Sequence, residues 1–187
     1  MTPIAENLNK NELTIRHSAD GFSYVFVPAA VYQDKQKEKY LDFLGIKDKN
    51  STVCSDYIEV ADVYNVYCTP EPENKEFRHA ASILLENLIR ENIERTDDVR
   101  IYLNVKDQRF EMFVLKGIKL LFNNTFRFKT KEDFLYFLLF SIEQLHLDAG
   151  SVPVYFLGMI EEDSKIVELT SRYVRDIRFK KDIKCEL

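Results

Sequence analysis

Residues 99–128 constrain the fold of this chain more than any other stretch. Three segments rich in β-branched and aromatic residues are separated only by short turns at residues 106–108 and 116–117. Connections this short join neighbouring antiparallel strands, because a parallel connection needs a dozen residues or more. The sequence therefore predicts a three-stranded antiparallel meander.

A helix is predicted directly after the meander. Thr130 is its expected N-cap, and Asp133 stands three residues later, in the spacing of a capping box. The predicted helix continues to about His146. Its apolar residues wrap most of the way around the axis, so we expect the helix to be buried on more than one side.

An apolar, β-rich run at residues 152–157 predicts a buried strand after this helix. Ser164 is expected to cap a last helix that ends at about Val174, and residues 177–179 form a candidate edge strand. A three-strand meander, a helix crossover and a parallel strand make a mixed sheet with helices on it. This is the topology of the ribonuclease H-like half-domain, the unit that is doubled in actin-like ATPases.

The first half of the chain predicts a shorter arrangement. The predicted elements are strands at 13–17 and 22–27, a helix between Asp34 and Gly45, a strand at 61–68 and a helix at 77–93. Asp34 is expected to cap the first helix and Gly45 to end it, with Tyr40, Leu41 and Leu44 as the buried stripe. The order β-β-α-β-α suggests an abbreviated copy of the second half.

The predicted fold class is therefore α/β, with two lobes. Residues 1–11 are polar and are expected to form a disordered N-terminus. Residues 12–97 are expected to form an abbreviated first actin-like lobe, and residues 98–187 a second, ribonuclease H-like lobe. The polar segment 94–98 is the predicted boundary.

Several blocks of the sequence resemble one family. The longest is VRIYLNVKDQRFEMFVLKGIKLLFNNTFRFKTKEDFLYFLLFSIEQLHLD, followed by VPVYFLGMI, and the earlier blocks are ELTIRHSADGFSYVF and FRHAASILLENLI. They are similar to a family of Bacteroidetes proteins classed as a domain of unknown function, of the DUF3822 type. The resemblance covers most of the chain after residue 11 and implies an actin-like ATPase fold. It implies no activity, because the family has none assigned.

An active actin-like ATPase needs glycine-containing hairpins that hold the nucleotide phosphates and an acidic residue that holds Mg²⁺ through water. In the first hairpin, Asp20, Gly21 and Ser23 are candidate nucleotide-binding residues, because Gly21 and Ser23 can approach a phosphate. An ordinary type I′ turn explains the same Asp-Gly pair, and we favour that interpretation.

The second hairpin, at residues 106–108, contains no glycine. Asn104 stands on the strand where a carboxylate directed at Mg²⁺ is wanted. Gly158 is a single glycine at the end of its strand, where a glycine pair is expected. Asn104 and Gly158 stay candidates for a nucleotide site. Because two of the three elements are missing, we expect no cofactor and little or no hydrolysis, with weak binding of ATP and Mg²⁺ as the alternative.

A metal-dependent nuclease is a third interpretation of the same fold, and it needs three or four acidic residues that converge on two metal ions. The second half offers Asp107, Glu111, Glu132 and Asp133. Glu132 and Asp133 are better explained as favourable charges at a helix N-terminus, and Asp107 as a turn residue. We therefore assign no catalytic residue and no metal ligand.

Aromatic residues are numerous, with 14 Phe and 10 Tyr. Phe122, Phe126 and Phe128 share one face of the third meander strand by a period of two. We expect them to form core beneath the long helix, and the alternative is an aromatic ridge at a partner interface.

Charge and cysteine content exclude several classes of protein. The net charge is −5, whereas a general binder of nucleic acid is usually basic. Three cysteines without a CxxC spacing argue against a disulfide framework and against a zinc site. The longest apolar run, at residues 134–142, is far shorter than the ~20 residues that cross a bilayer. We therefore expect a cytoplasmic protein without membrane insertion.

The sequence leads to one leading hypothesis and one alternative. The first is a non-catalytic actin-like protein that acts as a cytoplasmic interaction module or scaffold for an unidentified protein partner, without nucleic acid. The alternative is an actin-like protein that binds ATP weakly in the cleft between its lobes. The oligomeric state stays open, and a dimer is compatible with the sequence.

Overall fold

The computed structural model describes residues 23–45, 51–69, 78–91 and 98–180. The predicted N-terminal disorder, the strand at 13–17 and the Asp20–Gly21 turn lie outside these ranges. The chain divides into two compact units. The first consists mainly of the residues before 97 and the second mainly of those from 97 onward, while residues 117–121 are grouped with the first unit.

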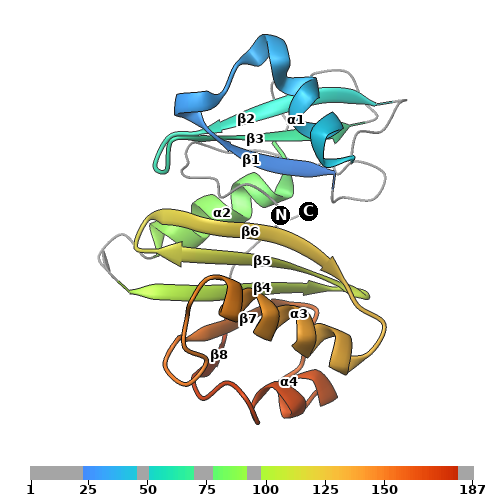
Figure 1. Cartoon of the computed structure of the whole chain (residues 1–187), viewed down its shortest axis with the longest axis vertical. Helices are drawn as coiled ribbons and strands as arrows, with labels where there is room; N and C mark the ends of the chain where they lie inside the picture. The colour runs from blue at the N-terminus through green and yellow to red at the C-terminus, as the bar shows by residue number, and fades with distance from the viewer. Residues whose placement is uncertain (1–22, 46–50, 70–77, 92–97, 181–187) are drawn as a thin grey trace. The chain divides into compact units, whose positions relative to one another are not determined.

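The first unit is built on a three-stranded antiparallel sheet (Figure 1). Its strands are β1 (Tyr24–Pro28), β2 (Thr52–Ile58) and β3 (Val63–Thr69). The middle strand is β3. Because successive strand residues point to opposite faces, each strand supplies side chains to both sides of this sheet.

Helix α1 (Lys37–Leu44) covers one of these faces. Leu41 is fully buried there against Val53 and Val66. As predicted, Gly45 ends the helix in the left-handed conformation, with a φ of 67°. Two short 3-10 helices, η1 (Ala29–Val31) and η2 (Asp34–Gln36), precede α1.

The prediction that Asp34 caps the first helix is wrong. The chain makes a 3-10 turn at Asp34, so α1 begins three residues later, with Gln36 as its N-cap and no side-chain cap bond. The Asp34 carboxylate instead accepts a hydrogen bond from the Tyr32 hydroxyl, at 2.9 Å. Asp34 is a residue type that commonly caps helices, but a local hydrogen bond from Tyr32 engages its carboxylate instead.

Strand β2 was not predicted from the sequence. Helices cover both faces of the sheet, so neighbouring residues such as Val53 and Cys54 are both buried. From Cys54 to Ile58 burial alternates, but the buried Asp56 is polar and the exposed Tyr57 is aromatic, so the sequence does not show the period of two that identifies a half-exposed strand.

Helix α2 (Ala80–Arg90) confirms the helix predicted in this region. It packs against β2 on the face of the sheet opposite α1. Its N-cap is His79, whose Nδ1 accepts a hydrogen bond from the Ala81 N–H at 3.1 Å.

The second unit contains the predicted meander within a five-stranded mixed sheet (Figure 1). The strands are β4 (Val99–Lys106), β5 (Arg109–Lys116), β6 (Lys119–Arg127), β7 (Val154–Gly158) and β8 (Ile177–Phe179). They lie in the order β6-β5-β4-β7-β8. Strand β4 pairs antiparallel with β5 and parallel with β7, and β8 is parallel to β7 at the edge, so the predicted mixed topology is confirmed.

Helix α3 (Lys131–Gln144) begins with the predicted capping box. Thr130 Oγ1 accepts a hydrogen bond from the Asp133 N–H at 3.1 Å, and Asp133 Oδ2 accepts one from the Thr130 N–H at 3.0 Å. The helix packs its Phe134 ring against Phe110 of the sheet, with ring centroids 4.3 Å apart. As predicted, Phe126 and Phe128 lie beneath α3 and contact its rings. They and Phe122 are only half-buried, so they line the edge of the core and do not belong to its fully buried part.

The expectation that α3 is buried on more than one side is wrong. Its buried residues lie on one face, and Tyr136 and Phe140 on the other face are 61% and 45% exposed. Aromatic residues lie on both faces of this helix, with Phe134 inside and Tyr136 and Phe140 outside, so apolar periodicity could not separate the core face from the outer face.

Helix α4 (Lys165–Thr170) packs against α3. Its predicted cap is confirmed, because Ser164 Oγ accepts a hydrogen bond from the Val167 N–H at 3.4 Å. The helix ends at Thr170 instead of the predicted Val174. Within the described ranges, no helix is long and apolar enough to cross a membrane.

Candidate functional site at the ends of β4, β5 and β7

Two predicted site residues, Asn104 and Gly158, come together in the second unit. They lie at the carboxyl ends of the parallel strands β4 and β7, where Asn104 pairs with Leu157 and Val105 pairs with Gly158. Open α/β sheets bind their ligands at the carboxyl ends of parallel strands. This end of the sheet is therefore the candidate functional site.

Gly158 has two structural reasons to be glycine. Its φ is 79°, in the region that side-chain-bearing residues rarely adopt. A Cβ atom at this position would lie 2.3 Å from Val105 O and 2.6 Å from Asn104 Oδ1. The same Val105 carbonyl accepts a hydrogen bond from the Met159 N–H at 2.7 Å. The glycine therefore lets the end of β7 close tightly onto β4.

Strand β5 adds a buried carboxylate to this site. Glu111 lies directly opposite Asn104 in the antiparallel pair and is only 1% exposed. Asn104 Nδ2 donates a hydrogen bond to Glu111 Oε2 at 2.6 Å, and Lys106 Nζ forms an ion pair with the same oxygen at 3.0 Å. Asn104, Lys106, Glu111 and Gly158 are called the strand-end cluster below.

From the sequence, Glu111 was considered only as a possible nuclease acid. The short turn between β4 and β5 nevertheless indicates that it lies beside Asn104. The turn between β4 and β5 consists of Asp107 and Gln108. A two-residue turn fixes the register, which places Lys106 opposite Arg109 and Asn104 opposite Glu111. Asp107 is an exposed turn residue, as predicted.

The strand-end cluster compensates its own charge. A metal ion that bound Glu111 Oε2 would compete with Lys106 for the same oxygen. Asn104 supplies a neutral amide at the position where an active ATPase of this fold needs a carboxylate that holds Mg²⁺. The turn carries no glycine, and Gln108 adopts the positive φ, at 34°. Among the described residues, no group of three or more His, Cys, Asp or Glu is placed to hold a metal.

Of the three candidate residues in the predicted first hairpin, the structure describes Ser23, while Asp20 and Gly21 lie outside the described residues. The Ser23 carbonyl accepts a hydrogen bond from the Cys68 N–H at 3.0 Å. This bond continues the pairing of β1 with β3.

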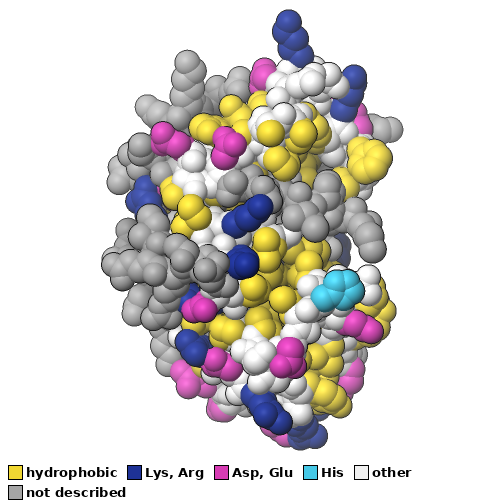
Figure 2. Space-filling model, turned by 60° about the vertical axis from the view of Figure 1, so that its left-hand side comes forward, with side chains coloured by type: hydrophobic (Ala, Val, Ile, Leu, Met, Phe, Trp, Pro, Cys, Tyr) yellow, Lys and Arg dark blue, Asp and Glu magenta, His cyan; other side chains and the backbone are white. Residues whose placement is uncertain are grey.

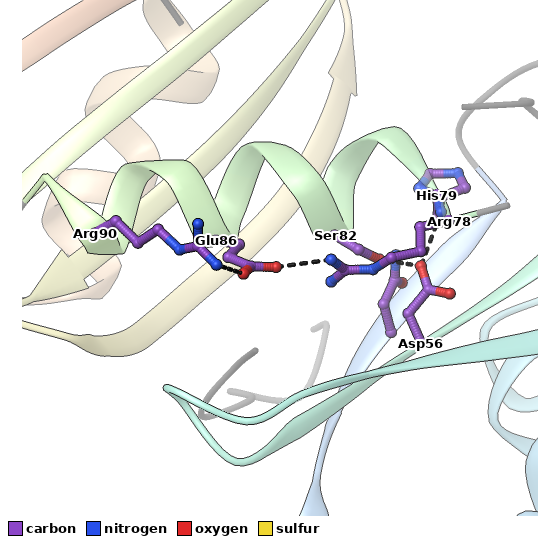
Figure 3. A network of polar contacts seen from close by, with 7 residues as sticks. Asp56, Arg78, His79, Ser82, Glu86 and Arg90 are labelled. Carbon is purple, nitrogen blue, oxygen red and sulfur yellow. Dashed lines mark hydrogen bonds and ion pairs between the residues drawn. The ribbon is translucent and has the colours of Figure 1, made fainter. Parts of the chain in front are cut away.

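A second polar cluster lies in the first unit, where α2 begins above β2 and β3 (Figure 3). Asp56 Oδ2 accepts hydrogen bonds from Ser82 Oγ at 2.6 Å and from the His79 N–H at 2.8 Å. Asp56 Oδ1 accepts one from the Tyr67 hydroxyl at 3.1 Å. These four residues are called the helix-start cluster. Burial raises the pKa of Asp56 above its usual value, although all three donors act in the opposite direction.

The helix-start cluster continues along α2 as a chain of charged pairs. Arg78 Nη1 lies 2.8 Å from Glu86 Oε2, and Arg90 binds the other oxygen of Glu86 (Figure 3). Asn65 Nδ2 donates a hydrogen bond to Ser82 Oγ at 2.9 Å. The network joins the start of the helix to two strands.

The helix-start cluster does not contain a nucleophile–base pair of the hydrolase type. The Ser82 hydroxyl donates a hydrogen bond to Asp56 Oδ2, and His79 Nδ1 accepts a hydrogen bond from the Ala81 N–H. The His79 ring is held between the rings of Tyr24 and Tyr67, each with a centroid distance of 4.9 Å. The contacts of this cluster hold the start of α2 on the sheet, which is a structural role.

The topology and the likeness to a solved structure show that the protein has the actin-like ATPase fold. A crystal structure from Bacteroides thetaiotaomicron, of a protein with actin-like ATPase fold and unknown function, matches with a TM-score of 0.75 and 15% identity over 84% of this chain and 65% of that one. The PilM–PilN type IV pilus biogenesis complex matches with a TM-score of 0.54 and 11% identity, with the same coverage of 84% and 65%. This chain therefore spans 65% of the length of each solved chain.

The chain belongs to the family of proteins of unknown function DUF3822, whose model matches residues 23–177. This match confirms the family resemblance seen in the sequence. A search of the curated proteins gives no match.

Proposed function

We propose that this protein is a non-catalytic actin-like protein that acts as an interaction module or scaffold for a protein partner. The strand-end cluster carries the proposal, because Lys106 and Asn104 both bind the same oxygen of Glu111, Oε2. An ATPase of this fold needs an acidic residue free to hold hydrated Mg²⁺ near this position. Here the buried carboxylate instead ties two neighbouring strands together.

A relative in fold supports a role in protein association. The PilM–PilN complex is, by its description, an assembly for type IV pilus biogenesis. At 11% identity the likeness is one of fold, so the partner proposed for our chain is a different, unidentified protein. We place this interaction in the cytoplasm, where the buried cysteines Cys54 and Cys68 suit a reducing environment.

Weak binding of a nucleotide is the alternative function. The observation that favours it is the position of Asn104 and Gly158 at the carboxyl ends of parallel strands, where ligands of open α/β sheets bind. Lys106 brings a cation to the same end. In this alternative the protein responds to ATP with little or no hydrolysis.

A thermal melt separates the two functions. The chain is heated alone, with millimolar ATP and Mg²⁺, and with millimolar ADP. A ligand at about 100 times its Kd stabilises a protein by about 2.7 kcal/mol, which is a readily measured shift. We expect no nucleotide-specific shift.

A saturable shift with ATP and Mg²⁺ that pyrophosphate does not reproduce would overturn the proposed function. The variant Asn104→Ala then tests where the nucleotide binds. If the shift is lost in this variant, the nucleotide binds at the strand-end cluster. Hydrolysis of ATP by the wild-type chain and not by the variant would establish an enzyme.

A further inference from the structure

Helix α3 presents two exposed aromatic side chains next to each other. Hydrophobic side chains reach the surface in several places, so exposure alone marks no site (Figure 2). Tyr136 and Phe140 differ because their rings stack, with centroids 5.9 Å apart and an interplanar angle of 18°. They lie four residues apart and so share one side of the helix. They are called the aromatic pair below.

Ring contacts connect the aromatic pair to the core. Tyr136 meets the edge of Phe137 at 5.5 Å, Phe137 stacks on Phe126 of β6 at 5.0 Å, and Phe126 contacts Phe110 at 5.2 Å. Exposed rings that are held in this way lose little conformational entropy when a partner covers them. Aromatic anchors of this kind dominate the energy of protein interfaces.

The charges of α3 are divided around its axis. The helix carries four charged residues, which are Lys131, Glu132, Asp133 and Glu143. At about 100° per residue, the three carboxylates lie within about 60° of the middle of the aromatic pair. The backbone of Lys131 lies on the opposite side, and its Nζ reaches Glu132 Oε1 at 3.8 Å. Backbone N–H groups of Lys129 and Thr130 hold the pKa of Asp133 below its usual value, so this carboxylate is ionised at neutral pH.

We propose that the outer face of α3 docks a basic segment of a protein partner. Apolar side chains of that segment lie on the aromatic pair, and its Lys or Arg side chains lie beside Glu132 and Glu143. The inference rests on the proposed function and names the chemistry of the partner. The choice of a basic partner comes from charge complementarity, because the aromatic side of the helix carries three carboxylates, and the one cation of the helix, Lys131, meets only Glu132, in an exposed ion pair of 3.8 Å.

A second copy of this chain meets an electrostatic penalty at the same face. An antiparallel two-fold pairing centred between Tyr136 and Phe140 places residue 133 opposite residue 143. Both are carboxylates. Like charges brought together at an interface weaken association, which favours a different, basic partner.

Selection from a displayed library of random 16-residue peptides tests the proposal. The full chain is the target, and the double variant Tyr136→Gln/Phe140→Gln is the counter-target, because Gln is polar and keeps the helix. The matched control is Phe43→Gln, which removes an aromatic side chain that is 84% exposed on α1. Affinities of the selected peptides are then measured by fluorescence anisotropy at two salt concentrations.

We expect the selected peptides to carry Lys or Arg around an apolar centre. Their affinity should fall about tenfold or more in the double variant, as for the loss of an interface anchor, and stay unchanged in Phe43→Gln. The variant Glu132→Gln/Glu143→Gln should weaken binding less and reduce its salt dependence. Peptides without basic enrichment, or peptides that bind the double variant equally well, would overturn the proposal.

Two further results have defined meanings. A concentration-dependent dimer, seen by light scattering and abolished in Tyr136→Gln/Phe140→Gln, would assign this face to a second copy and overturn the basic-partner proposal. Peptides that bind specifically but elsewhere would refute the site on α3 and leave the interaction function standing. The nucleotide melt decides the proposed function separately, because the aromatic pair takes no part in the strand-end cluster.

Discussion

Among the described strand residues, each sheet carries one buried carboxylate, and the two are held in different ways. Asp56 in the helix-start cluster accepts hydrogen bonds from two hydroxyls and a backbone N–H. Glu111 in the strand-end cluster has a lysine and an amide on one oxygen. The donors to Asp56 are neutral and can stay buried inside the protein. The Lys106 side chain that pairs with Glu111 is 31% exposed and can return to water. The comparison teaches that a buried acid alone does not identify a catalytic site.

The largest effect is expected from the glycine of the strand-end cluster. Gly158→Ala adds a methyl group 2.3 Å from a backbone carbonyl at a φ of 79°. We expect a loss of about 3 kcal/mol or more in the free energy of unfolding, because neither β7 nor β4 can move freely. Urea denaturation measures the loss, and hydrogen exchange should show it in β4 and β7.

Gly45 of the first unit provides the matched control. It has a similar φ of 67°, but an added Cβ meets nothing within 4 Å. Gly45→Ala should therefore cost only about 1–2 kcal/mol, the strain of the left-handed conformation. Equal losses for the two variants would show that the contact with Val105 contributes nothing.

The next effect compares the two carboxylates directly. Asp56→Asn places an amide NH₂ group among three donors, so at least one buried donor loses its acceptor. We expect a loss of about 2 kcal/mol in the free energy of unfolding. Glu111→Gln keeps an oxygen for Asn104 and lets Lys106 turn to water, so its cost should be about 1 kcal/mol. A larger loss for Glu111→Gln would reverse the comparison.

The starts of α1 in the first unit and α3 in the second also differ. Helix α3 has a complete capping box, whereas α1 has no side-chain cap bond. Thr130→Ala should cost about 1 kcal/mol, while Thr130→Ser, which keeps the hydroxyl, should cost little. Chemical denaturation of both variants measures the difference. If Ala and Ser behave alike, the hydroxyl of Thr130 does not stabilise α3.

The smallest effect is expected in the pH dependence. Burial raises the folded-state pKa of Asp56, so the folded protein binds a proton more readily than the unfolded chain. The contribution of Asp56 to stability should therefore fall as pH rises from about 4 through the raised pKa, and stay level above it. Asp133 and Asp148 have lowered pKa values and should act in the opposite sense, losing their contribution as pH falls below about 4.

A pH series of unfolding free energies for the wild type and Asp56→Asn isolates the first of these contributions. The difference between the two proteins should decline with rising pH in the stated window. A difference that increases with pH would mean that the hydrogen bonds to Asp56 outweigh its burial.

Much of the second unit was predictable because its determinants are local. The two short turns and the alternating residues between them predicted the meander, and the Thr130–Asp133 spacing predicted the start of α3. For the candidate site, the sequence identified Asn104 and Gly158 separately. It also contained the two-residue turn that places Glu111 opposite Asn104.

The first unit was less predictable because its contacts are distant in sequence. Asp56 meets His79 and Ser82, which follow it by 23 and 26 residues. Strand β2 lacks an alternating pattern of polar and apolar residues because its buried position 56 is an aspartate and its exposed position 57 is a tyrosine. Neither the burial of Asp56 nor its donors can be inferred from the residues next to it.

The sequence by itself determined the family, the order of most elements and the missing glycine of the second hairpin, since each depends on residues that are close together in the chain. Tertiary structure alone decided that Lys106 and Asn104 share one oxygen of Glu111, and that Tyr136 and Phe140 face outward on α3. Strand register and helix rotation are set by packing between distant segments. The chemistry of a polar cluster or an exposed surface depends on that packing, because it fixes which groups meet and which remain in contact with water.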